Sequence, residues 1–209
     1  MNFRKTLKRK DCSLTRFKTE DEKTADLLKD LFTENEIAEF LNQEYLKNRT
    51  KPKIRRWMKE KADHPYEKWY VIKWKTRHVG YICFKWRKHY DEACEISTAI
   101  HKDYRGLKLG FHSSKLLIDY ILDLKKFKYI VGYVFLTNKK AENNLRKLGF
   151  RMNNRLHKII TKEFYGSDGS DKEDRKYNLM VIYGNKFKPS LPFGECLKTK
   201  IFTTKTPRH

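Results

Sequence analysis

Residues 95–110 decide the fold, and they read Glu95-Ile-Ser-Thr-Ala-Ile-His-Lys-Asp-Tyr-Arg105-Gly-Leu-Lys-Leu-Gly110. The stretch begins as a strand, continues as a basic loop that contains glycine, and leads into apolar residues at helical spacing. A glycine-bearing loop that opens a helix brings unpaired backbone N–H groups and the positive end of the helix dipole together. The donors and the dipole of such a loop both favour an anion.

Three elements are predicted after this loop. An amphipathic helix follows first, with one apolar face formed by Leu116, Leu117, Tyr120, Ile121 and Leu124. Residues 129–136 are almost all apolar, as in a buried central strand. Residues 138–148 predict a second helix, which Gly149 ends in the C′ position. Beyond it, residues 158–165 and 177–183 are expected to form a hairpin around the polar loop 166–175.

The segment before the loop predicts a strand, two helices and a meander. Residues 12–18 alternate as a short strand does, and Thr19 precedes an acidic cluster that signals a helix start. Apolar residues at helical spacing then predict two helices, with a break between Thr33 and Asn35. Residues 51–65 are basic and loop-like, although Ile54, Trp57 and Met58 would form the buried stripe of a short helix. Three strand-like runs joined by polar turns predict an antiparallel meander over residues 69–74, 79–86 and 93–100.

This order of elements resembles the GNAT superfamily of N-acyltransferases, and two motifs strengthen the resemblance. The loop is similar to the family's pyrophosphate loop, Gln/Arg-x-x-Gly-x-Gly/Ala, with Arg105 and Gly110 at its ends and Lys108 at the middle glycine. Residues 138–150 resemble the segment Asn-x-x-Ala/Ser-x-x-x-Tyr/Phe-x-Lys-x-Gly-Phe, with Leu145 in place of the aromatic residue. The resemblance covers roughly residues 12–183.

The resemblance implies an α+β fold in which helices flank both faces of a mixed, mostly antiparallel central sheet. It also implies acetyl-CoA as the co-substrate. The implied coenzyme-binding residues are Ile100, His101, Arg105, Gly106, Leu107, Lys108, Leu109, Gly110 and Asn138. In the family the asparagine contacts the pantetheine arm, whereas residue type alone predicts equally well that Asn138 caps a helix. Gly149 and Phe150 would begin the next strand.

For catalysis, the resemblance implies direct attack of a primary amine on the thioester in a ternary complex, without a covalent acyl-enzyme. Family members commonly use a carboxylate on the strand before the loop as the general base, and Glu95 matches that position. A strand glutamate also fits a solvated or salt-bridged role. Leu145 replaces the tyrosine that protonates the departing thiolate in relatives, so another group, water or the amine itself would supply that proton.

Length and composition predict one domain at residues 12–184, a basic leader at 1–11 and an irregular basic tail at 185–209. No apolar run is long enough to cross a membrane, and the chain starts without a signal-peptide pattern, so we expect a cytoplasmic protein without a membrane partner. The four cysteines lie far apart and lack metal-ligand spacing, which predicts free thiols and no metal site.

A net charge of +22 favours an acidic partner such as nucleic acid, the ribosome or an acidic protein, although a lysine-rich composition also explains the charge without any partner. Two further hypotheses remain open. The chain could be a nucleic-acid-associated protein whose interleaved rings are Trp57, Tyr66, Trp69, Tyr70 and Trp74. It could also bind acyl-CoA without catalysis, which Leu145 would suit. No motif identifies the amine acceptor, and the protein is expected to be a monomer or a homodimer.

Overall fold

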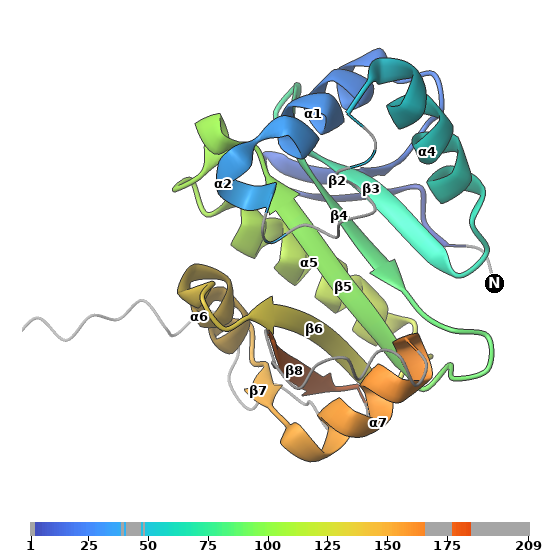
Figure 1. The fold of residues 1–209 in the computed structure, drawn as a ribbon, viewed down its shortest axis with the longest axis vertical. Coiled ribbons are helices and arrows are strands. Elements are labelled where there is room, and N and C mark those ends of the chain that lie inside the picture. The colour runs from blue at the N-terminus through green and yellow to red at the C-terminus, as the bar shows by residue number, and fades with distance from the viewer. Residues whose placement is uncertain (1–2, 39, 41–46, 48, 166–176, 185–209) are drawn as a thin grey trace, which may run out of the picture.

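The computed structural model describes residues 3–38, 40, 47, 49–165 and 177–184, and it shows one open sheet with helices on both faces (Figure 1). In this part of the chain the sheet has eight strands in the order β1-β2-β3-β4-β5-β6-β8-β7. The strands are β1 Thr6–Arg9, β2 Cys12–Arg16, β3 Glu67–Trp74, β4 Arg77–Lys85, β5 Ala93–Ile100, β6 Tyr129–Phe135, β7 Arg151–Met152 and β8 Tyr177–Tyr183. Only β5 and β6 pair in parallel, which confirms the predicted mixed, mostly antiparallel sheet.

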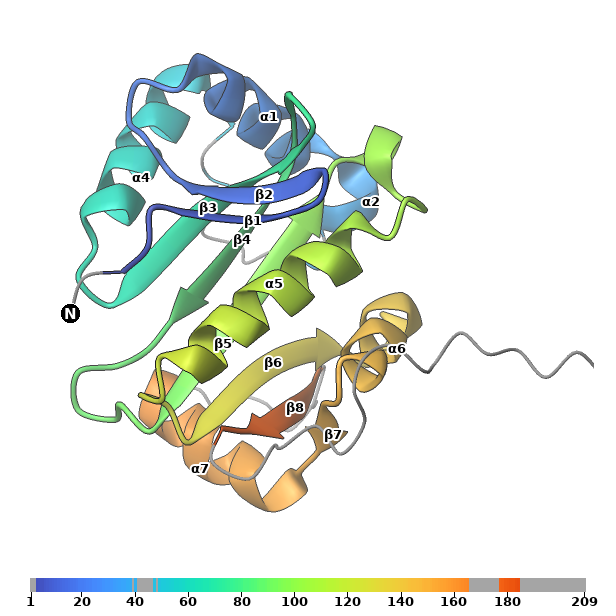
Figure 2. The same cartoon turned by 180° about the vertical axis from the view of Figure 1, so that it is seen from behind.

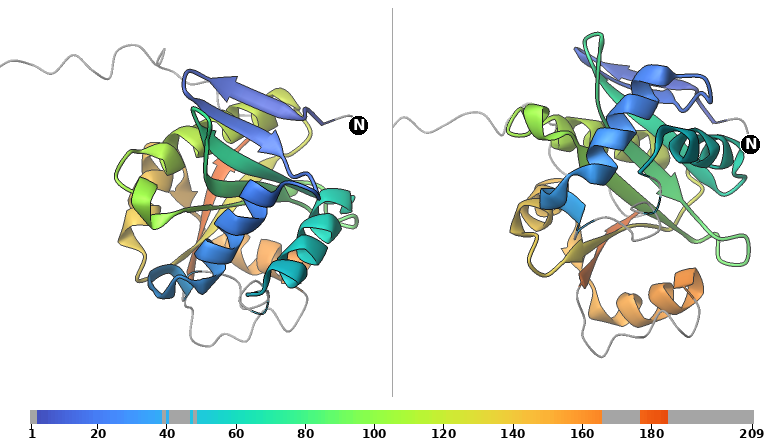
Figure 3. Two further views of the ribbon diagram at one scale, coloured as in Figure 1. Left: turned by 90° about the horizontal axis from the view of Figure 1, so that it is seen from above. Right: turned by 45° about the horizontal axis from the view of Figure 1, so that its top comes forward.

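The helices form two layers around this sheet. They are α1 Glu22–Thr33, α2 Asn35–Ala38, α4 Lys51–Asp63, α5 Leu109–Asp123, α6 Lys139–Lys147 and α7 Asn154–Tyr165, with a short 3-10 helix, η1, at Lys102–Tyr104. Seen from behind, α5 crosses the middle of the sheet (Figure 2). The helices α1 and α4 lie together over the opposite face, blue and teal in Figure 3. Helix α7 covers the lower part of that same face (Figure 1).

The buried side chains form one cluster beneath each group of helices. Under α5, the largest cluster contains Tyr70, Phe84 and Leu117. The second lies under α1 and α4, where the rings of Trp57 and Trp69 meet at 4.9 Å. The third lies under α7. Burial of this much apolar surface is the main favourable contribution to folding, and it places both tryptophans in the interior.

The segment at residues 51–63 is a full helix, because its apolar residues recur at helical spacing. Ile54, Trp57 and Met58 are buried against the sheet, as the alternative prediction for this segment required. Since Trp57, Trp69 and Tyr70 are each at most 2% exposed, they cannot stack on nucleic-acid bases. The hypothesis that these rings form a face that binds nucleic acid is therefore not supported for Trp57, Trp69 and Tyr70.

The predicted hairpin of residues 158–165 with 177–183 is wrong. Residues 154–165 form α7, whose buried residues His157, Ile160 and Phe164 recur at intervals of three and four. The adjacent β-branched residues around Ile159 suggested a strand, but Ile159 is 45% exposed and only the helical stripe is buried. Strand β8 instead pairs with β6 along its whole length. The polar loop 166–175 and the tail 185–209 lie outside the described residues.

The predicted basic leader at residues 1–11 contains a strand of the sheet. Thr6–Arg9 forms β1, which pairs antiparallel with β2, and Leu7 is buried. The charged residues around Leu7 concealed a strand of only four residues, with a single apolar anchor. At the helix start predicted near Thr19, the residue that caps α1 is Asp21, because its Oδ1 accepts a bond from the Thr24 amide at 3.2 Å. Among the described residues, no helix is long and apolar enough to span a membrane.

Gly80 provides a direct test of how β4 and β5 approach each other. A Cβ at this position would lie 2.2 Å from the Ala99 carbonyl oxygen, so the backbone would have to move. We expect Gly80→Ala to lower the free energy of unfolding by about 2 kcal/mol, measured by denaturant titration. Gly110→Ala is the control, because its added Cβ would make an ordinary 3.4 Å contact with Ile100. Equal stability of the two variants would contradict the close approach.

Candidate functional site

The candidate site begins where β5 and β6 part. The two strands pair only from Ala93 to Glu95 on β5 and from Tyr129 to Val131 on β6. Beyond those residues β5 stays paired with β4, and β6 stays paired with β8. Figure 1 shows the two strands diverging toward their carboxyl ends. The edges of β5 and β6 that face each other beyond this point are therefore left without a neighbouring strand.

The loop after β5 supplies a row of free backbone donors. Gly106 and Lys108 have positive φ angles of 84° and 57°, and α5 begins at Leu109. Within the described part of the chain, the N–H groups of residues 106–111 donate to no acceptor, and the first bond of the helix runs from the His112 amide to the Lys108 carbonyl at 3.0 Å. Such donors at a helix N-terminus suit an anion, so the predicted diphosphate loop has the required geometry.

Lys108 is in the left-handed conformation that the family's glycine would adopt without strain. Its φ of 57° and ψ of 16° are disfavoured for a residue with a Cβ. The backbone donors are nevertheless kept, and the side chain is exposed at the loop. The substitution of lysine for glycine therefore adds a positive charge beside the donor row at the cost of local backbone strain.

Arg105 serves the loop in a way that the sequence did not reveal. Its guanidinium lies 2.6 Å from a Glu34 carboxylate oxygen and 3.0 Å from one of Glu36, and its Nε donates to the Ile100 carbonyl at 3.1 Å. These contacts attach the loop to the end of α1, to α2 and to the end of β5. The predicted phosphate contact of Arg105 would have to compete with two carboxylates, so the structure favours a positioning role for this side chain.

The backbone at the end of β5 is also partly used within the protein. The Ile100 carbonyl accepts the Arg105 bond, and the His101 amide donates to the Val79 carbonyl at 2.9 Å. These two groups, predicted to face pantetheine, are therefore bonded to the protein itself. The open side of β5 toward β6 is the part of this strand end that remains for a ligand.

On α6, Asn138 is a helix cap, since its Oδ1 accepts a bond from the Ala141 amide at 3.0 Å. This confirms the capping alternative, and the contact with pantetheine stays a prediction. Leu145 packs toward β6, where a Cβ added to Gly132 would lie 3.1 Å from its Cδ1. The position of the family tyrosine is thus filled by an apolar side chain. Gly149 ends the helix with a φ of 94°, as predicted.

Glu95 is the last residue of β5 that pairs with β6, and its carboxylate is buried in a small polar network. One oxygen lies 3.1 Å from Lys85 Nζ, and the other accepts a bond from the Tyr165 hydroxyl at 2.6 Å. Only 8% of the Glu95 side chain is exposed. Tyr165 as a whole residue is 42% exposed, but desolvation of its hydroxyl and the charge of the neighbouring Glu95 raise the pKa of Tyr165 well above its usual range, so this group remains a hydroxyl donor.

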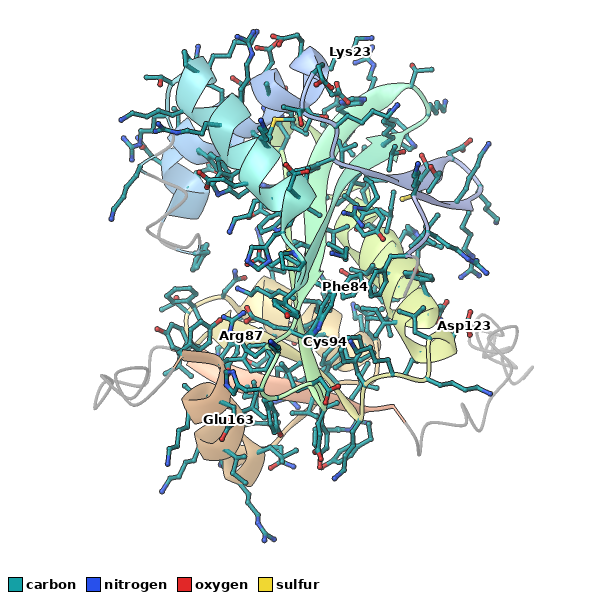
Figure 4. The ribbon with its side chains drawn as sticks, turned by 90° about the vertical axis from the view of Figure 1, so that its right-hand side faces the viewer. Lys23, Phe84, Arg87, Cys94, Asp123 and Glu163 are labelled. Atoms are coloured by element: carbon teal, nitrogen blue, oxygen red, sulfur yellow. The ribbon has the colours of Figure 1, made fainter. Side chains whose placement is uncertain are left out.

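The sequence could have revealed one partner of Glu95 but not the other. Lys85 faces Glu95 across the β4–β5 ladder, so the register of the predicted meander could have revealed the pair. Tyr165 was missed, because its segment was predicted to be a strand. Arg87 supports the end of α7, donating from Nε to the Phe164 carbonyl at 2.9 Å, and it lies beside that helix in Figure 4.

Comparison with known proteins agrees with this geometry. The family model described as an acetyltransferase (GNAT) domain matches residues 13–151. No curated protein sequence matches the chain. Among solved structures, a GNAT-family acetyltransferase from Bacillus anthracis is similar with a TM-score of 0.64 at 12% identity, covering 86% of this chain and 99% of that one.

Two further solved structures show the same fold. RimL, a ribosomal L7/L12 alpha-N-protein acetyltransferase in complex with coenzyme A, has a TM-score of 0.59 at 12% identity and covers 84% of this chain and 93% of its own. MccE, a microcin C7 self-immunity acetyltransferase in complex with acetyl-CoA and AMP, has a TM-score of 0.61 at 15% identity with the same two coverages. With the family model matching more than half of the sequence, the chain belongs to the GNAT family of acetyltransferases.

Proposed function

We propose that this protein transfers an acetyl group from acetyl-CoA to a primary amine by direct attack in a ternary complex. The observation that carries the proposal is the row of unpaired N–H groups at residues 106–111, placed beside the parting of β5 and β6. Family membership supports the reaction class, and the coenzyme complexes of RimL and MccE support the choice of co-substrate.

The residues present fit a coenzyme with a diphosphate. The N–H groups of Gly106, Leu107, Lys108, Leu109 and Gly110 would hold its phosphate oxygens, and the Lys108 side chain would add positive charge. The open edge of β5 near Ile100 and His101, together with the cap of α6 at Asn138, would flank the pantetheine arm. Acetyl-CoA supplies the thioester carbonyl that the amine attacks.

In the reaction, the amine nitrogen forms a bond to the carbonyl carbon, the carbon–sulfur bond breaks, and the nitrogen loses a proton. We propose Glu95 as the acceptor of that proton. Because both of its oxygens are engaged, the proton would reach it through the Tyr165 hydroxyl or through a water that displaces one partner. With Leu145 at the family's tyrosine position, the departing sulfur would be protonated by water, another side chain or the amine's own proton.

The acceptor is a primary amine of unassigned structure, and the net charge of +22 favours one carried on an acidic body, such as an acidic protein or a ribosomal particle. We propose that residues 12–184, extended by β1, form the catalytic domain and act in the cytoplasm. A panel of amines scored by release of free coenzyme A thiol tests the function. Tight acetyl-CoA binding with no turnover on any amine would favour a non-catalytic acyl-CoA-binding module.

Gly110→Asp tests the diphosphate loop. A carboxylate in the first turn of α5 is compatible with the helix dipole, so the fold should persist, but it would repel the phosphates. We expect acetyl-CoA affinity by calorimetry to fall about tenfold or more. Gly110→Ala is the matched control and should bind like the wild type. If Gly110→Asp binds equally well, the diphosphate does not lie at this loop.

Lys108→Gly separates backbone strain from charge. Glycine relieves the left-handed conformation, so the free energy of unfolding should rise by up to about 1 kcal/mol. Lys125→Gly is the control, because Lys125 is also exposed and left-handed, with a φ of 51°, at the far end of α5. Only Lys108→Gly should weaken acetyl-CoA binding, and only at low salt. A gain in affinity for this variant would show that the lysine impairs the loop.

Glu95→Gln and Tyr165→Phe test the general base. If the proton passes through Tyr165 to Glu95, both variants should lose about a hundredfold in turnover and the acidic limb of the pH–rate profile should disappear. Tyr133→Phe is the control, because the Tyr133 ring packs beside Tyr165 at 5.6 Å, whereas its hydroxyl lies 3.0 Å from Thr161 Oγ1 and not on the Glu95 carboxylate. Unfolding and acetyl-CoA titrations would identify loss of structure. A Glu95→Gln variant with wild-type turnover at every pH would place the base elsewhere.

A further inference from the structure

A cavity of about 610 Å³ lies at the corner of the sheet where β1 begins, β2 ends and β3 begins. Its polar lining consists of Lys5, Thr6, Thr15, Arg16, Lys18 and Lys68. Cavities of this size commonly hold small organic ligands. The GNAT reaction proposed above makes no use of this corner.

The cavity is remote from the coenzyme loop. Lys68 stands at the start of β3, whereas Trp74 at the other end pairs with Arg77, near the point where Gly80 of β4 faces Ile100 of β5. Trp74 is six residue steps along the strand from Lys68, which corresponds to roughly 20 Å. A ligand in the cavity would therefore occupy the opposite end of the sheet from the donor row.

The acidic residue that acts on Lys68 is the adjacent Glu67, whose carboxylate is already bonded to Lys61 and to the Trp69 ring nitrogen. No aspartate or glutamate is among its lining residues. Lys68 is buried, and its Nζ donates to the carbonyls of His64, Pro65 and Glu67 at 2.9 to 3.0 Å. Burial, followed by the positive charge of Arg16, lowers the pKa of Lys68 to about 8. The like charges thus disfavour each other, and an anion between them would relieve that repulsion.

Several donors remain for such an anion. Arg16 Nη2 donates to the Ala62 carbonyl at 3.3 Å and the guanidinium also interacts with Tyr70, while the Nε is buried without an acceptor among the described residues. Lys5 and Lys18 are exposed and form no ion pair within the described part of the chain. Thr6 and Thr15, which both line the cavity, stand opposite each other in the β1–β2 register. Charged and hydroxyl donors in one hollow suit a phosphate group.

Phe3 and Phe17 complete the lining, but the Phe17 ring is buried against Trp57 and Trp69, whereas Phe3 is only partly buried. Phe3 offers apolar surface next to the cations, as a ligand with a flat or apolar carbon part would require. We propose that this cavity binds a small organic phosphate, with the phosphate on Lys5, Arg16 and Lys18 and the carbon part against Phe3. A nucleic-acid strand is disfavoured, because it needs successive exposed rings along a groove, and Trp57 and Trp69 are buried.

The test uses phenyl phosphate as the probe, titrated by calorimetry into the full chain with and without saturating acetyl-CoA. We expect phenyl phosphate to bind in both conditions and more tightly than inorganic phosphate. Lys5→Gln/Lys18→Gln should weaken its binding about tenfold or more, because two charge-assisted contacts are lost. Both lysines are exposed, so this variant should fold. Lys158→Gln/Lys162→Gln on α7 removes the same charge elsewhere and should bind like the wild type.

Four results would overturn the proposal. They are the absence of binding, equal weakening by the two double variants, displacement of phenyl phosphate by acetyl-CoA, and affinity for inorganic phosphate equal to that for phenyl phosphate. Binding of a twelve-residue oligothymidylate with no binding of phenyl phosphate would also overturn it and assign the corner to nucleic acid. Acetyl-transfer activity is not a readout, so failure here leaves the proposed reaction untouched, and failure of that reaction leaves this site untouched.

Discussion

The structure depends on a change in the pairing of β5. Ala93 and Cys94 pair with β6, Glu95 pairs with both β4 and β6, and after Glu95 only β4 remains as a neighbour. A strand edge without a partner exposes backbone groups that must be satisfied elsewhere. The same divergence brings the end of β5 to the loop that starts α5. The free edge, the free N–H groups and the helix dipole therefore converge because one parallel ladder stops after three residue pairs.

The buried network at Glu95 lies where this ladder ends. A carboxylate that is 8% exposed would be costly without partners, and Lys85 and Tyr165 supply them from β4 and α7. The three groups join the two halves of the sheet on the face opposite α5. A proton acceptor in this place would have its partners already positioned, but each partner also competes for the lone pairs that a proton would need. Catalytic and structural roles of Glu95 therefore place opposing demands on the same two oxygens.

Much of the fold could be predicted, because its signals are local. The meander, α5, β6 and α6 follow from periodicity, and Gly149 marks a helix end with its positive φ. The errors came where local pattern and packing disagree. In α7, adjacent β-branched residues suggested a strand, while only the tertiary contacts of Ile160 and Phe164 select the helix. The loop was predictable from its glycines, whereas the partners of Arg105 and Glu95 depend on contacts between distant segments, which no single motif encodes.

Some positive charges of the chain are paired with acidic residues and others are not. The net charge alone therefore does not predict where an acidic ligand would bind. Arg105 is neutralised by Glu34 and Glu36, so the loop relies on backbone donors and Lys108 for anions. On α4, Lys51 and Arg55 are paired with Glu22 of α1. At the β1–β2 corner, by contrast, cations gather around a hollow with no acidic residue in its lining. A lysine-rich composition explains the total of +22, but it does not explain why some cations are paired and these are not. Unpaired like charges that lie close together repel one another and lower the stability of the fold. The cations around the cavity are therefore the ones whose repulsion an anionic ligand would relieve.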